Sequence, residues 1–113
     1  MANTRIIGKH KTKVIRTENT LAVKYVNTVV VYNTPSRVVL NTGGWKTNTT
    51  KTRMNQAANQ YYLGYQVFQK NYNWYVKCLR SEKIFEFEND GIVLDRYVHG
   101  FELGTNSEIL DLV

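Results

Sequence analysis

The chain has 113 residues, of which 42% are hydrophobic, and it carries 15 lysine or arginine residues against nine acids, a formal net charge of +6. This length and apolar content predict one folded domain over residues 1–113 and exclude a disordered chain. No apolar run reaches the length of a transmembrane helix, and the N-terminus lacks a signal-peptide segment. A single cysteine excludes an internal disulfide, so we expect a cytoplasmic protein with no membrane partner.

The charge is distributed unevenly along the chain. Residues 1–56 contain ten lysine or arginine residues and one acid, whereas residues 57–113 contain five such cations and eight acids. A basic half is typical of proteins that bind a polyanion on one face. Alternatively, the two halves neutralise one another within the fold or across a dimer, and the composition favours neither interpretation.

A basic stretch lies near the start of the chain, between the apolar pairs Ile6–Ile7 and Val14–Ile15. The stretch is either the tip of a hairpin that pairs these two apolar segments or part of a flexible basic arm. Its lysines, Lys9, Lys11 and Lys13, are candidate phosphate contacts, because basic loops beside a sheet commonly hold phosphates. Simple solvation of the three lysines is the alternative.

Short β-branched runs then predict a meander of antiparallel strands over residues 21–26, 29–32 and 37–40. In the second half, residues 65–69 and 74–78 flank a four-residue loop and predict a hairpin. Residues 84–88 and 92–94 flank Asn89-Asp90-Gly91 and predict another hairpin.

One helix is predicted over about residues 50–63, where Met54, Ala57, Ala58 and Tyr61 share one face at helical spacing. This face should pack on the sheet. We expect Thr49 or Thr50 as the N-cap and Gly64 as the residue that ends the helix. The polar residues expected off the packed face are Lys51, Arg53, Gln56, Asn59 and Gln60.

The loop before this helix is rich in groups that can hold an anion. The partial positive charge at a helix N-terminus makes the nearby cations Lys46, Lys51 and Arg53 unfavourable unless an anion is bound. The candidate ligands are these cations, the N–H groups after Gly43-Gly44, and the hydroxyls of Thr47, Thr49 and Thr50. The alternative is that the cations face water.

Several aromatic residues follow the helix. Tyr61, Phe68 and Trp74 are expected in the core, whereas Tyr72, in a loop near Lys70, is the best candidate for stacking on a nucleic-acid base. Residues 97–113 are predicted to be a C-terminal extension. Its apolar end, residues 109–113, should dock on its own sheet or on a partner chain, which would make the protein a homo-oligomer.

The sequence contains no catalytic motif. His10 and His99 have no Cys, Asp or Glu at metal-ligand spacing. Cys78 has the setting of a small buried residue, and the nearby carboxylates of Glu86 and Glu88 are expected at the surface. We therefore expect a protein that is not an enzyme and uses no cofactor or metal.

The segment 40–56 contains Thr-Gly-Gly-Trp and Thr-Thr-Lys-x-Arg-Met-Asn, and it is followed by Phe-Gln-Lys at 68–70 and Trp-Tyr-Val at 74–76. In these motifs the chain resembles a set of small tailed-bacteriophage proteins of unassigned activity. The resemblance covers roughly residues 12–95. It implies a phage accessory protein that works in the cytoplasm of a bacterial host.

We predict an α+β fold with one helix packed on an antiparallel sheet of short strands, with strong curling of the sheet as an option. The leading hypothesis is a non-enzymatic protein that binds nucleic acid through its basic half. The alternatives are an inhibitor or modulator of a host defence protein, and a binder of a small anion or nucleotide at the helix N-terminus. The candidate binding residues are Lys9, Lys11, Lys13, Lys46, Thr49, Thr50, Lys51, Arg53 and Tyr72.

Overall fold

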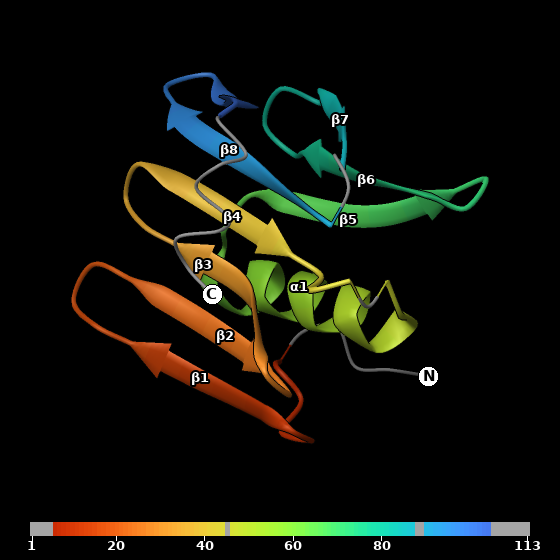
Figure 1. Ribbon diagram of the computed structural model, residues 1–113. Helices are drawn as coiled ribbons and strands as arrows, with labels where there is room; N and C mark the ends of the chain where they lie inside the picture. Colours follow the sequence, from red (N-terminus) through yellow and green to blue (C-terminus); the bar gives the residue numbers. More distant parts are fainter. Residues whose placement is uncertain (1–5, 45, 88–89, 105–113) are drawn as a thin grey trace.

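The structure is a computed structural model that describes residues 6–44, 46–87 and 90–104. These residues form one helix and nine strands in two antiparallel sheets, so the α+β prediction is confirmed (Figure 1). In chain order the elements are β1 (Thr12–Arg16), β2 (Leu21–Tyr25), β3 (Thr28–Asn33), β4 (Arg37–Asn41), α1 (Asn48–Tyr61), β5 (Tyr65–Lys70), β6 (Asn73–Cys78), β7 (Ile84–Glu86), β8 (Gly91–Tyr97) and β9 (Gly100–Leu103).

The larger sheet has the strand order β1-β2-β3-β4-β8-β9, and the smaller sheet has the order β5-β6-β7. The predicted meander is confirmed, because β2, β3 and β4 pair in sequence. The sheet does not close on itself. Side chains from α1 and from both sheets join in a single apolar core. Apolar residues alternate inward along β2, where Leu21 and Val23 are buried, as expected for a strand with one covered face.

The hairpin predicted at the start of the chain is wrong. β1 pairs with β2, from Thr12 opposite Tyr25 to Arg16 opposite Leu21. Ile7 is instead buried in the core, and its N–H donates to Gln60 Oε1 of the helix at 2.8 Å. Since this contact joins residues far apart in the chain, no local pattern could reveal it. The segment around Ile7 is therefore anchored to the helix, which also contradicts a flexible arm.

The hairpin predicted around residue 90 is also wrong. β7 pairs with β6, whereas β8 pairs with β4 on one side and β9 on the other. The reason is burial, since Ile92, Val93 and Leu94 are at most 1% exposed. A strand buried on both faces belongs in the interior of a sheet.

The β5–β6 hairpin is confirmed, with a tighter turn than expected. Asn71 and Tyr72 alone connect the two strands, and both have positive φ, 51° and 69°. A two-residue turn of this kind matches the right-handed twist of the paired strands, which a four-residue loop need not do.

The first part of the predicted C-terminal extension belongs to the larger sheet. β9 forms its edge, and Phe101 is buried in the core at 2% exposure. Arg96 of β8 lies with its guanidinium 4.9 Å from the Phe101 ring centroid and donates to the Leu63 carbonyl at 3.2 Å. The predicted docking of residues 109–113, and the homo-oligomer it would form, lie outside the described residues, as do Trp45 and Glu88.

The helix begins and ends two residues earlier than predicted. Thr47 is the N-cap, and its Oγ1 accepts the N–H of Thr50 at 3.2 Å, so the prediction of Thr49 or Thr50 is wrong. Three threonines lie within four positions, and the conformation of the preceding loop determines which of them is the N-cap. The helix ends at Tyr62, which has φ 55° and donates its N–H to the Ala58 carbonyl. Gly64, the predicted terminator, lies instead in the turn into β5 with φ 89°.

The predicted apolar face of the helix is confirmed. Met54, Ala57 and Ala58 are buried, and Tyr61 is half-buried against the core. The helix is also joined to β5, because the Tyr65 hydroxyl donates to the Met54 carbonyl at 2.8 Å. Burial raises the pKa of Tyr65, so this hydroxyl stays protonated and remains a donor.

Two residues expected off this face, Arg53 and Gln56, are nevertheless buried, at 8% and 3% exposure. The helix is covered on a second side, because Gly8 donates its N–H to Gln56 Oε1 at 3.0 Å. The helical pattern alone showed only the side that faces the sheet.

Candidate nucleic-acid interface

Segments that are far apart in the sequence meet at one end of the fold. Figure 1 shows the start of β1 and the β2–β3 turn at the lower centre of the view, the N-terminus of α1 to their right, and the β5–β6 turn farther away at the upper right. The Val26 N–H donates to the Lys11 carbonyl at 2.8 Å, and Arg53 Nε donates to Thr12 Oγ1 at 2.9 Å. The two basic segments predicted separately are therefore joined. We call the lysines of this region the basic end: Lys9, Lys11, Lys13, Lys46 and Lys51.

The basic end lacks neutralising partners within the described part of the chain. None of its five lysines forms an ion pair with a described carboxylate. Lys13 lies directly opposite Lys24 across β1 and β2. Like charges placed opposite each other destabilise a sheet. Asp90 lies near this end, where its carbonyl accepts the Thr42 N–H at 2.7 Å, and its side chain is exposed.

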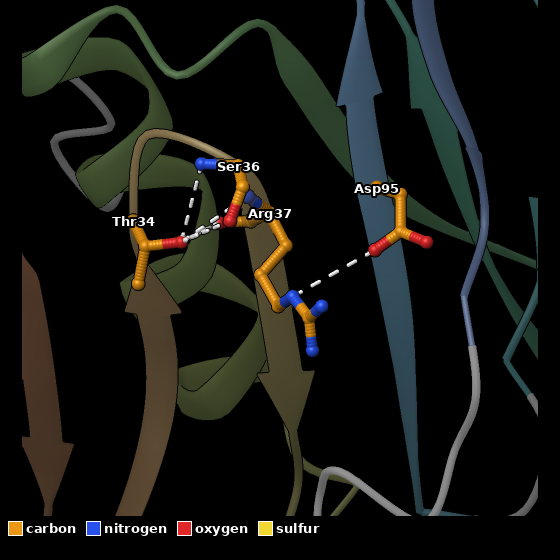
Figure 2. Close-up of polar contacts among 4 residues, drawn as sticks. All are labelled: Thr34, Ser36, Arg37 and Asp95. Atoms are coloured by element: carbon orange, nitrogen blue, oxygen red, sulfur yellow. Dashed lines mark hydrogen bonds and ion pairs between the residues drawn. The ribbon is translucent and has the colours of Figure 1, made fainter.

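At the other end of the strands, the two halves of the chain do neutralise one another. Arg37 Nε lies 3.7 Å from Asp95 Oδ1, and this pair joins β4 to β8 (Figure 2). The turn before Arg37 is held by Thr34, whose Oγ1 accepts the N–H groups of Ser36 and Arg37. Among the residues that the structure describes, internal neutralisation thus applies to Arg37 and not to the basic end.

Arg53 points toward the N-terminal segment rather than into solvent. Its Nη1 donates to Gln56 Oε1 at 3.1 Å, and its guanidinium carbon lies 5.7 Å from the Tyr25 ring centroid. Gly8 packs against the same guanidinium so closely that a Cβ there would stand 2.6 Å from Nη1. Arg53 therefore links the helix, β1 and the N-terminal segment.

The groups predicted to surround an anion do not converge on one point. The N–H groups of Gly43 and Gly44 donate to Asn41 Oδ1 and Thr42 Oγ1 within the loop. Lys51 lies toward the smaller sheet, with Nζ 6.0 Å from the Trp74 ring centroid. Thr49 is half-buried in the first helical turn, and the buried Thr50 hydroxyl pairs with that of Thr47 at 3.1 Å.

A cavity of about 340 Å³ opens beside this helix N-terminus, between the β2–β3 turn and the residue that follows β4. Its lining residues are Tyr25, Val26, Asn27, Thr28, Val30, Thr42, Thr47 and Thr50. Thr47 and Thr50 were predicted from the sequence as ligands, whereas the other lining residues were not. No signal in the sequence could have found them, because the β2–β3 turn meets the helix only through the tertiary fold.

Tyr72 is 91% exposed and stands at the tip of the β5–β6 hairpin. Trp74 and Phe68 differ from it. Trp74 is buried in the core, as predicted, and Phe68 is half-buried with its ring stacked on Tyr75 at a centroid distance of 5.5 Å.

The family model of the Kyanoviridae Gp96 protein matches residues 1–103. The chain belongs to this family of phage proteins. Comparison with curated proteins and with solved structures found no match. The family assignment supports the expectation of a phage protein.

Two further findings concern the described residues of this Gp96 family member. No helix among them is long and apolar enough to cross a membrane. They also contain no group of three or more His, Cys, Asp or Glu side chains placed to hold a metal ion.

Proposed function

We propose that this protein is a non-enzymatic phage accessory protein that binds nucleic acid in the host cytoplasm through its basic end. The observation that carries the proposal is that five lysines, on segments far apart in the chain, have no described carboxylate partner, while two of these segments are joined by hydrogen bonds. The opposed pair Lys13 and Lys24 adds to this charge. Contacts with phosphates would relieve the repulsion and release counterions, the main source of affinity for nucleic acid.

Tyr72 supports the same proposal. Its φ of 69° lies in the left-handed region, where glycine, asparagine and aspartate are favoured and a large side chain is unusual. Residues held in such a conformation occur often at functional sites. An exposed ring at a hairpin tip can stack on a base, and stacking contributes about 1–3 kcal/mol per base.

The Lys9→Ala, Lys11→Ala, Lys13→Ala triple variant should bind a single-stranded oligonucleotide about tenfold more weakly than wild type at about 50 mM salt, because it loses phosphate contacts. The matched control is Lys77→Ala, Arg80→Ala, Lys83→Ala, which removes the same charge away from the basic end. We expect the control to stay within about twofold of wild type. Fluorescence anisotropy gives all three dissociation constants, and equal losses in the two variants would contradict the proposed location.

A second candidate is docking on a host protein, such as a defence protein. Leu79 and Val98 lie in turns and Ile84 begins β7, and these apolar side chains are 51%, 69% and 56% exposed. The turns are neighbours, since Gly100 packs against Cys78 and Ser81. Exposed apolar groups of this kind occur at protein interfaces. Binding to a host protein would survive nuclease treatment and weaken little as salt rises, unlike binding to phosphates.

A further inference from the structure

The cavity beside the helix N-terminus has a lining that suits a neutral, flat ligand. None of its lining residues is charged. An anion placed inside would lose its hydration without gaining a cation, which is unfavourable. The four threonine hydroxyls and the Asn27 amide supply donors and acceptors, while Tyr25, Val26 and Val30 supply apolar surface. Its volume of about 340 Å³ is at the lower end of the range for small-molecule sites.

The entrance to the cavity shows a second unusual feature. Val26, one of the lining residues, is 51% exposed and has φ 57°. A β-branched residue is strongly disfavoured in the left-handed region, and glycine would be expected at such a turn. The turn is held in this position by the hydrogen bond from the Val26 N–H to the Lys11 carbonyl. An apolar side chain therefore stands at the entrance at a conformational cost.

Cations flank the cavity, although none lines it. Lys11 is bonded through its backbone to Val26, and Lys46 precedes the lining residue Thr47 in the chain. The phosphates of a strand that contacts these lysines would run past the entrance. An unpaired base of that strand could then turn inward, whereas a base in a duplex would first have to leave its pair and its stack.

We propose that this cavity receives one unpaired nucleobase of a single-stranded nucleic acid whose phosphates contact the flanking lysines. This inference rests on the proposed function and adds a preference for single strands. The cavity hydroxyls hydrogen-bond the edge of the base, and the apolar lining contacts its faces. Tyr72 stacks on a different base.

The test compares a 12-nucleotide thymidine strand with an abasic strand of the same length, which carries the same phosphates without bases. Wild type should bind the thymidine strand about tenfold more tightly than the abasic strand. Val26→Gly and Asn27→Trp should each reduce this ratio at least threefold while leaving the affinity for the abasic strand unchanged. The first variant removes lining surface without strain at the turn, and the second fills the entrance.

The matched control is Tyr62→Gly, because Tyr62 has nearly the same φ as Val26, 55° against 57°, and does not line the cavity. It should keep the wild-type ratio. Thermal melting checks that each variant is folded. If Val26→Gly misfolds, Asn27→Trp still provides the test, because Asn27 is exposed.

The outcomes separate this inference from the proposed function. Equal wild-type affinity for the two strands, or a ratio unchanged in both cavity variants, overturns the base site and leaves nucleic-acid binding intact. Failure to bind either strand overturns both. If thymidine monophosphate competes with the thymidine strand at the same concentration, the cavity binds a free nucleotide. This result overturns the single-strand proposal.

Discussion

Met54→Asp is expected to unfold the domain. Met54 is 0% exposed and lies where the helix meets the core. A carboxylate in that position would lose its hydration with no cation to pair with. The free energy of unfolding should therefore fall by about 4 kcal/mol or more. Because small domains have a total stability of about 5–15 kcal/mol, the variant should be largely unfolded near 37 °C.

Circular dichroism during heating measures this effect. The control is Met54→Leu, which keeps the apolar volume and should cost less than about 1.5 kcal/mol. A Met54→Asp protein that melts within about 2 °C of wild type would show that this face of the helix is not core.

Arg53→Ala should produce the next largest decrease in the free energy of unfolding, about 2–4 kcal/mol. The truncation leaves Thr12 and Gln56 without the guanidinium that bonds them, and it opens a space beside Gly8. Arg53→Lys should lose almost as much, because an ammonium group cannot reproduce the planar fork of donors. Chemical denaturation measures both losses, with the less buried Lys51→Ala as a control expected within about 1 kcal/mol of wild type.

The same variant separates a structural role from a binding role. Folded Arg53→Ala, studied well below its melting temperature, should bind the oligonucleotide nearly as tightly as wild type, because Arg53 is only 8% exposed. An affinity loss as large as that of the triple lysine variant would instead identify Arg53 as a phosphate contact.

Local patterns in the sequence were sufficient for the elements whose partners are close in the chain. The meander from β2 to β4 and the β5–β6 hairpin depend on neighbouring segments, and the spacing from Met54 to Tyr61 identified the packed face of the helix. β7 and β8 were assigned to one hairpin because their turn signal is local. In the structure β7 pairs with β6 and β8 pairs with β4, because β8 is buried in the core.

The candidate site was foreseen only in part, for the same reason. The density of cations was visible in the sequence, but the contact between the Lys11 segment and the β2–β3 turn was not. Arg53 was expected either at a bound anion or in water, because helical spacing cannot show that Gly8 covers a second side of the helix. The cavity is lined by three segments that are separate in the chain, so no sequence motif predicts it.

The salt dependence of binding tests the central claim most directly. We expect the protein to bind a single-stranded oligonucleotide at about 50 mM salt, and each phosphate contact to add about 0.7 to the log–log slope. If all five lysines of the basic end make contacts, the affinity should fall with a slope of about −3 to −4. No binding at about 50 mM salt, or an affinity that does not change as salt rises, would contradict the account.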